Sequence, residues 1–253
     1  MPQLEGPIRD KYVSAGGEAV FGAVTSDRRS VVGGVYQTCE RAVFYLKDSS
    51  AEAFFTRGLI FDKWGTVRNA QGRGWEQGPL GWPVSDEYRV ARELGAGQRF
   101  ERGTFFYRDG QPEAFWSTGL ILDKYGSVGW EQGDLGFPVT DHAMTPDGRG
   151  AFQHFAGTDL PASIYYNPNQ GRAWIVRGVI RAFYAASGWE RGVPFGPGSP
   201  WLTGFPLGDE YLTAASYAKP GQPADAFEQD FEGANIYWPR IGSAEFVDPA
   251  YKG

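Results

Sequence analysis

A five-residue element, Gly-Trp-Glu-(Gln/Arg)-Gly, occurs three times in the chain and is the part best suited to contact a ligand. In each copy an indole is followed directly by a carboxylate. The pairs are Trp75–Glu76, Trp130–Glu131 and Trp189–Glu190. A pyranose ring stacks its C–H face on an indole while its hydroxyl groups hydrogen-bond to charged acceptors, so each pair could bind a sugar. The structural alternative is that each Trp fills the gap between neighbouring repeats and each Glu caps backbone N–H groups.

Further carboxylates recur downstream of the three elements, at Asp86, Asp141 and Asp209, and we expect them to belong to the same ligand-binding surface. Paired carboxylates can hydrolyse glycosidic bonds. A catalytic pair is normally unique, however, whereas these acidic residues repeat. We therefore expect no catalytic residues and a protein that is not an enzyme. Turnover of a polysaccharide that is lost on Glu131→Gln would contradict this expectation.

Metal and cofactor chemistry has little support in the sequence. The two histidines, His142 and His154, hold different positions in one repeat, and no cluster of His, Cys and carboxylates has the spacing of a metal site. His142 takes the place of Glu87 and Glu210 in sister repeats, which indicates a solvated polar position. We expect neither a metal nor a cofactor.

A single cysteine, Cys39, excludes an internal disulfide. It aligns with Phe100 and Phe231 of other repeats. We therefore expect its thiol to replace a buried ring as a small hydrophobic group, rather than to act as a nucleophile.

Charge and composition exclude two classes of partner. The 253-residue chain has a net charge of −6 and a pI of about 5.1, without the basic surface that nucleic-acid binding requires. No apolar stretch approaches the roughly 20 residues that cross a bilayer, so membrane insertion is not expected. The polar N-terminus has no signal-peptide core, and we expect the chain to be either cytoplasmic or a mature form behind a new Met.

Aligning the chain with itself reveals four related repeats. Three of them start with a Gly-led apolar segment and continue through the Trp-Glu element to a Gly-Pro-containing tetrad. They span residues 57–87, 118–142 and 177–210. A weaker copy at residues 5–27 lacks both the Trp and the Pro.

Each repeat is expected to combine a helix, a loop and an aromatic hairpin, which gives an α+β fold. The Gly-led segments predict short amphipathic helices near residues 7–14, 58–65, 119–126 and 178–187. Aromatic runs predict β-hairpins near residues 42–56, 104–117, 163–177 and 235–247. The last three hairpins are preceded by candidate third strands at residues 98–102, 152–155 and 227–232. The tetrad must be a loop, since Pro lacks an N–H donor and Gly permits close backbone approach.

Both ends of the array look incomplete. The first helix has no hairpin before it, and the last hairpin has no helix after it. We infer that the N-terminal helix completes the last hairpin. The termini would then be adjacent, and four pseudo-symmetric repeats would close into a propeller-like ring, one domain over residues 1–253.

The tetrads carry a family resemblance. Leu-Gly-Phe-Pro at 135–138, followed by Val-Thr-Asp at 139–141, resembles the signature of the LGFP-repeat family. The tetrad at 80–83 has Trp for Phe, and the one at 203–206 has Thr for Leu. The hairpin and helix at 164–180 are also typical of this family. Residues 21–27 depart from the pattern because they lack the Pro.

The resemblance implies a module of the cell wall of mycolic-acid-bearing actinobacteria, often joined to secreted hydrolases or mycolyltransferases. Its implied role is attachment to envelope polysaccharide such as arabinogalactan or peptidoglycan, and its implied location is extracellular or in the cell wall. The repeats leave no room for a hydrolase domain in this chain, so a free-standing lectin-like protein is an alternative interpretation.

Residues and resemblance together predict a multivalent, lectin-like carbohydrate-binding protein whose weak sites gain avidity on a polymer. The alternative is a protein-interaction scaffold that uses the same exposed aromatic residues. The scaffold would be favoured if Trp130→Ala and Trp189→Ala left sugar binding unchanged but abolished binding of a protein partner.

Overall fold

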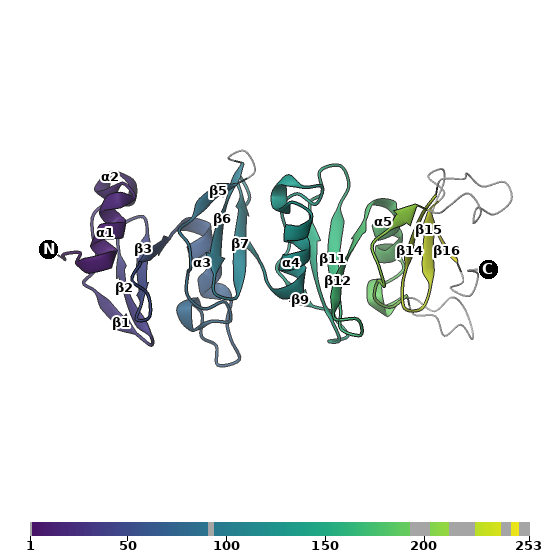
Figure 1. The fold of residues 1–253 in the computed structure, drawn as a ribbon, viewed down its shortest axis with the longest axis horizontal. Coiled ribbons are helices and arrows are strands. Elements are labelled where there is room, and N and C mark those ends of the chain that lie inside the picture. Colours follow the sequence, from purple (N-terminus) through teal and green to yellow (C-terminus); the bar gives the residue numbers. More distant parts are fainter. Residues whose placement is uncertain (1, 91–93, 193–202, 213–225, 239–243, 248–253) are drawn as a thin grey trace. The chain divides into compact units, whose positions relative to one another are not determined.

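The structure is a computed structural model and describes residues 2–90, 94–192, 203–212, 226–238 and 244–247 (Figure 1). These residues form four antiparallel four-stranded sheets together with short helices, which is the expected α+β repeat. The chain divides into two compact units, Met1–Gly119 and Leu120–Gly253. Each unit contains two of the sheets.

The first unit contains two sheets, ordered β1-β2-β3-β4 and β5-β6-β7-β8. Before and within the first sheet the elements are α1 (Gly6–Ser14), α2 (Gly17–Phe21), β1 (Arg29–Val31), β2 (Gly34–Thr38), β3 (Val43–Lys47) and β4 (Phe54–Thr56). Next come α3 (Gly58–Thr66), the 3-10 helix η1 (Trp75–Gln77), β5 (Tyr88–Val90), β6 (Gly95–Phe100), β7 (Gly103–Arg108) and β8 (Phe115–Ser117).

The second unit repeats this order with sheets β9-β10-β11-β12 and β13-β14-β15-β16. Its first elements are α4 (Gly119–Ser127), η2 (Trp130–Gln132), β9 (Ala143–Met144), β10 (Ala151–Phe155), β11 (Ala162–Asn167) and β12 (Arg172–Arg177). They are followed by α5 (Gly178–Ala186), η3 (Trp189–Arg191), β13 (Tyr211–Leu212), β14 (Phe227–Asp230), β15 (Asn235–Trp238) and β16 (Glu245–Val247).

The helices α1, α3, α4 and α5 each contact the sheet that follows them, and α3 and α5 also contact the sheet before them. For description we define a module as a helix plus the next sheet. Modules 1 to 4 cover residues 6–56, 58–117, 119–177 and 178–247. Ile8 of α1 is buried with Phe44 and Phe55, on β3 and β4 of its own sheet. In module 4, α5 contributes Ile180 and Tyr184 to a core that contains Ile236 of β15.

The helix and the hairpin at the two ends of the array have partners within their own units. The last hairpin was expected to be completed by the N-terminal helix; in the structure α5 packs on β15, and α1 packs on β3 and β4. A contact between the N-terminal helix and the last hairpin stays a prediction. Among the described residues no closed barrel or propeller is found, and neither the ring nor adjacent termini are confirmed.

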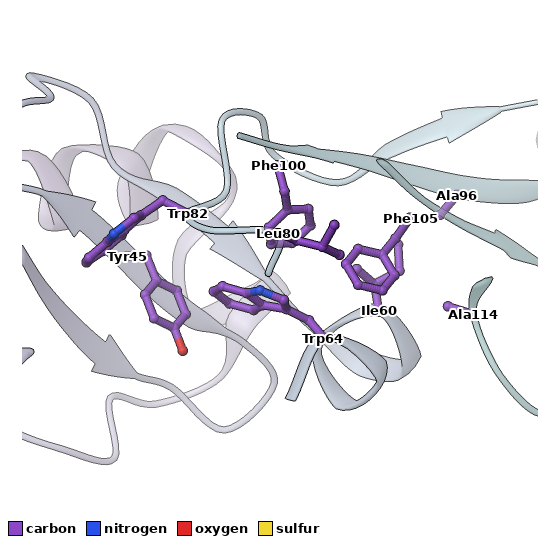
Figure 2. Close-up of a cluster of buried hydrophobic side chains, with 9 residues drawn as sticks. All are labelled: Tyr45, Ile60, Trp64, Leu80, Trp82, Ala96, Phe100, Phe105 and Ala114. Atoms are coloured by element: carbon purple, nitrogen blue, oxygen red, sulfur yellow. The ribbon is translucent and has the colours of Figure 1, made fainter. Parts of the chain in front are cut away.

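Aromatic residues join the two modules of the first unit (Figure 2). Trp64 of α3 lies between Tyr45 of β3, at 5.0 Å between ring centroids, and Phe100 of β6, at 4.8 Å. Phe105 of β7 continues the series at 5.1 Å from Phe100. Trp64 is fully buried, and its helix is therefore covered by a sheet on each side.

The LGFP-type tetrad is irregular, as predicted, but its proline forms an isolated antiparallel bridge to the next sheet. Pro83 bridges to Phe100, Pro138 to Phe155 and Pro206 to Phe231. The hydrogen bonds lie on either side of the proline: Glu101 N donates to Trp82 O at 3.0 Å, and Val84 N donates to Arg99 O at 2.9 Å. The missing N–H of proline therefore costs no ladder bond.

The first module forms the same bridge without a proline. Val24 pairs with Cys39 in the position of the three proline bridges. The glycine before it, Gly22, has φ of +73°, close to the +70° of Gly81. This left-handed backbone is what the glycine of the tetrad supplies, because other residues adopt it at a cost.

Candidate functional site

The three Trp-Glu elements form the 3-10 helices η1, η2 and η3, and their tryptophans share an uncommon backbone conformation. Trp75, Trp130 and Trp189 have φ of 48°, 57° and 58°. A bulky residue in this left-handed region is strained by about 1–3 kcal/mol. The same strain at three equivalent positions indicates that the turn serves to place the indole.

A glycine of the preceding helix makes room for the indole in modules 2 and 3. A Cβ atom built on Gly65 would lie 2.7 Å from Trp75 Cε2, and one built on Gly126 would lie 2.5 Å from Trp130 Cζ2. Module 1 has no tryptophan in this element, and Val13 takes the glycine position there. The helix glycine and the tryptophan therefore form one structural pair.

Two of the three tryptophans are open to solvent. Trp75 and Trp130 each expose 40% of their surface. Beside Trp75 lie Phe61, at 6.1 Å between ring centroids, and the half-buried Glu76, which accepts a hydrogen bond from Gln77 Nε2 at 3.2 Å. Glu131, next to Trp130, is 9% exposed. Each element therefore presents part of an indole next to a carboxylate.

Trp189 differs, because residues of its own chain cover it. The guanidinium of Arg181 lies 5.2 Å from the centre of the indole, and His154 stacks on it at 5.3 Å and 29°. Both are linked by Ser163, whose hydroxyl accepts from Arg181 Nε at 2.6 Å and lies 2.7 Å from His154 Nδ1. Burial, reinforced by the charge of Arg181, lowers the pKa of His154 to about 4, so the imidazole is neutral at pH 7.

Glu190 lines a hollow of about 470 Å³ in the second unit. The residue is 2% exposed, and burial raises its pKa. The predicted Trp-Glu pairs are therefore not equivalent: the pairs in modules 2 and 3 present an indole at the surface, whereas the pair in module 4 presents a carboxylate in a hollow.

Two of the predicted aspartates bind the preceding module. Asp86 accepts from the backbone N–H of Phe55 at 3.1 Å and from Lys11 Nζ at 2.8 Å. Asp209 accepts in the same way from Ile175 N at 2.7 Å and from Lys124 Nζ at 2.5 Å. The structure thus places these two carboxylates between modules and away from the tryptophans. Asp141 is half-buried.

A repeated buried glutamine completes this contact and was missed by the sequence analysis. Gln98 Nε2 donates to Phe55 O at 2.8 Å and to Ser85 O at 2.9 Å. Gln229 Nε2 donates to Ile175 O and to Gly208 O, both at 2.8 Å. Phe55 and Ile175 lie on the edge strands β4 and β12. We use the name backbone clasp for each pair of side chains, one Asp and one Gln, that hydrogen-bond to the backbone N–H and C=O of the same edge residue. The repetition of Gln at positions 37, 98, 153 and 229 was the available signal.

A salt bridge next to the clasp lies at two further hollows of the second unit. Arg177 Nε donates to Glu210 Oε1 at 2.5 Å, and Arg177 also lies 3.4 Å from Asp134. These three residues line adjoining hollows of about 250 and 310 Å³. Arg57 and Glu87 form the corresponding bond in the first unit at 2.9 Å.

The remaining candidates lie in the core or at its margin. Cys39 is 6% exposed within the core of module 1, and burial raises its pKa to about 11, so it is a thiol at neutral pH. The expectation of a solvated His142 was wrong: the residue is half-buried, and burial lowers its pKa. Among the described residues no group of three or more His, Cys, Asp or Glu could hold a metal ion.

The helices within the described ranges are too short or too polar to cross a membrane. The fold and the tetrads define the class of protein: an array of α+β modules, each with a tight glycine-containing segment bridged to its sheet, and with a proline at the bridge in three of the four modules. The model of the LGFP repeat matches residues 80–133 and 135–192, which confirms the predicted resemblance and shows that this part of the chain carries LGFP repeats.

A comparison with curated proteins found no match to this chain. Among solved structures, the chain is similar to the extracellular domain of the putative one-component system BT4673 from B. thetaiotaomicron, with 10% sequence identity. The alignment covers 90% of this chain and 24% of that one, so the chain spans about a quarter of that protein's length. The TM-score of 0.18 is too low to support a shared fold.

Proposed function

We propose that the protein is a non-catalytic, multivalent carbohydrate-binding protein that attaches to a polysaccharide of the cell envelope. The observation that carries the proposal is the pair of partly exposed indoles, Trp75 and Trp130, each in a strained turn next to a carboxylate. Strain of this kind concentrates at ligand-binding sites. An indole face with adjacent acceptors is the chemistry that recognises a pyranose ring.

The proposed location rests on the family resemblance. LGFP repeats resemble modules that hold proteins on envelope polysaccharide, and we propose an extracellular or cell-wall location with a glycan as the partner. Trp189 is left out of the proposed stacking sites because Arg181 and His154 cover its ring.

The test is retention of the full chain on insoluble peptidoglycan and on arabinogalactan, compared with Trp75→Ala, Trp130→Ala and the double variant. We expect the double variant to lose at least about tenfold in affinity, roughly 1.4 kcal/mol. Tyr88→Ala is the matched control, because Tyr88 is a 38% exposed aromatic residue outside the elements. Equal retention of the wild type and the folded double variant would contradict the proposal.

The second candidate is a protein-interaction scaffold, which the same partly exposed tryptophans favour because such residues anchor interfaces. It would replace the first if the double variant kept its polysaccharide binding but lost a protein partner. An enzymatic function would require turnover of the bound polysaccharide that Glu131→Gln abolishes.

A further inference from the structure

The hollow at Glu190 is a built site that the stacking surfaces do not use. It lies between two modules of the second unit. The β9–β10 turn of module 3 contributes Asp147 and Arg149, and module 4 contributes Glu190, Arg191 and Glu232. Its volume of about 470 Å³ is within the roughly 300–1,000 Å³ of small-molecule sites.

Most of the charges in this hollow are already paired. Arg149 Nε lies 2.7 Å from Asp147 Oδ2, and Arg149 Nη1 lies 3.5 Å from Glu232 Oε2. Glu232 also accepts from Asn169 Nδ2 at 2.6 Å and from Phe205 N at 3.1 Å. These bonds fix the walls of the hollow.

Arg191 has donors to spare. Its Nη2 donates to Pro146 O at 2.6 Å, and its side chain makes no further hydrogen bond with the part of the chain that the structure describes. A guanidinium carries five N–H donors, so several remain for a ligand.

Glu190 is the least paired of these carboxylates: it is only 2% exposed and makes no ion pair with another described residue, and its carboxylate is hydrogen-bonded by its own backbone N–H alone. Burying a carboxylate without a counter-ion in contact is costly, and here burial raises its pKa. The charge of Asp147 adds to this effect, while the backbone N–H of Glu190 and the charges of Arg191 and Arg149 offset part of it. A ligand that brings a positive charge to this carboxylate would remove that cost.

The balance of charge points the same way. Three carboxylates (Asp147, Glu190, Glu232) face two guanidiniums (Arg149, Arg191), which leaves a net charge of −1 when all are ionised. A ligand that fits must therefore combine a cation with groups that accept hydrogen bonds from a guanidinium. A sugar with a free amine combines the two.

We propose that this hollow binds an amino sugar with a free amine, with its ammonium at Glu190 and its ring hydroxyls at Arg191. The inference rests on the proposed function, since it specifies the sugar that module 4 recognises. Module 4 would thus recognise the positive charge of the sugar's ammonium group, whereas Trp75 and Trp130 would stack on sugar rings.

The test uses the full ¹⁵N-labelled chain titrated with D-glucosamine and, separately, with N-acetyl-D-glucosamine at about pH 6, where the free amine is protonated and acetylation removes its charge. The amide signals of Gly204 and Gly233 report on the site because both residues line the hollow. We expect saturable shifts with glucosamine and an affinity at least about tenfold higher than for the acetylated sugar.

Two variants make the result specific. Glu190→Gln is expected to remove the preference for the free amine. Arg191→Gln should lower the affinity for both sugars while the preference for glucosamine remains. Glu18→Gln is the control, because Glu18 is an exposed carboxylate of module 1 outside the proposed binding sites. Equal affinity for the two sugars, unchanged binding to Glu190→Gln, or shifts that bypass Gly204 and Gly233 would each overturn the inference.

The two proposals fail separately. Loss of polysaccharide retention in the Trp75 and Trp130 variants tests the general function and does not involve this hollow. If retention depends on the tryptophans but glucosamine does not bind, the amino-sugar inference alone is wrong. If glucosamine binds at Glu190 while retention is independent of Trp75 and Trp130, the stacking sites are wrong and the hollow stands.

Discussion

The paired helix glycine and tryptophan are the most specific feature at the scale of single residues. Gly65 and Gly126 leave space that an indole fills, and a Cβ atom at either position would overlap the ring. Module 4 has Ala185 at the same helix position, and there the tryptophan packs against Arg181 and His154 instead. The indole is therefore exposed in the two modules with glycine at this helix position and covered in the module with alanine.

Gly126→Ala tests this relation. The added methyl would lie 2.5 Å from Trp130 Cζ2, so the ring must move or the turn must distort. We expect a loss of about 1–3 kcal/mol in the unfolding free energy, measured by urea denaturation, with a change in Trp fluorescence.

Gly208→Ala is the control for this substitution. A Cβ atom at Gly208 would meet no atom within 4 Å, and its φ is not in the left-handed region. We expect a change below about 0.5 kcal/mol there. Equal losses for the two variants would show that the indole does not set the cost.

His154 makes stability depend on pH. Its pKa is lowered from 6.5 to about 4, chiefly by burial, so folding favours the neutral ring. The unfolded chain binds the proton more tightly, and the unfolding free energy must fall as the pH decreases from about 6.5 to 4. Discounted for partial exposure, the expected loss is about 1–2 kcal/mol, measured as Tm across this range.

His154→Phe should flatten this pH dependence, because a phenyl ring can stack on Trp189 but cannot titrate. His142 has a pKa lowered by burial and contributes with the same sign, so His142→Phe serves as the comparison. Glu190 acts in the opposite direction, since an acid with a raised pKa gains a proton more readily in the folded state. A pH dependence that is unchanged in His154→Phe would reject this assignment.

At the scale of elements, the backbone clasp explains how one sheet ends against the next module. The edge strands β4 and β12 would otherwise present unpaired backbone groups, which is the usual route to unwanted strand pairing. Here an aspartate takes the N–H and a glutamine takes the C=O of the same residue, Phe55 or Ile175. The edge is satisfied by side chains without an additional strand.

Gln98→Leu is predicted to break this contact while keeping the size of the buried side chain. The carbonyls of Phe55 and Ser85 would each lose a donor. We expect the unfolding free energy to fall by about 1–3 kcal/mol. Gln111→Leu, at an exposed loop position, is the control and should be nearly neutral. A neutral Gln98→Leu would mean that the clasp adds no stability.

The sequence predicted the elements better than their assembly. Glycine-led apolar runs and aromatic alternation indicate helices and hairpins locally, and the helices begin at Gly6, Gly58, Gly119 and Gly178 as those runs suggest. Self-alignment gives the period of a repeat but not its starting point, so the sequence alone does not decide whether a helix belongs with the hairpin before it or with the sheet after it. The short outer strands β1, β5, β9 and β13 were missed, because two or three exposed residues carry no hydrophobic pattern.

The candidate site shows the same limit. The shared motif of the three Trp-Glu elements predicted three equivalent binding sites. The surroundings of each tryptophan and glutamate, however, are formed by residues distant in the sequence. Only the fold places His154 on Trp189 and Asp147 near Glu190. Asp86 and Asp209 were grouped with the tryptophans by spacing, and the structure assigns them to the clasp.

At the scale of the whole molecule, the open tryptophans are divided between the compact units, Trp75 in the first and Trp130 in the second. Two weak sites on one chain gain affinity on a polymer that reaches both. We predict that either single alanine variant weakens binding to a long polysaccharide by about tenfold or more.

A short oligosaccharide that occupies one site at a time provides the comparison. Each single variant should then change the observed affinity by no more than about twofold, because the other site remains. Isothermal titration with matched long and short fragments measures both values. Equal effects on the two lengths would argue against multivalent attachment.

The clasp holds main-chain atoms, and this has a consequence for how such arrays grow. The residue it grips is aromatic at position 55 and aliphatic at position 175, with the same two bonds in each case. Because the two clasp bonds go to backbone atoms, they do not depend on the side chain of the residue that is held. Exchange of the preceding module therefore requires no compensating substitution in the clasp itself. Duplication, loss or shuffling of whole modules can therefore lengthen or shorten the array without changing the two bonds of the clasp.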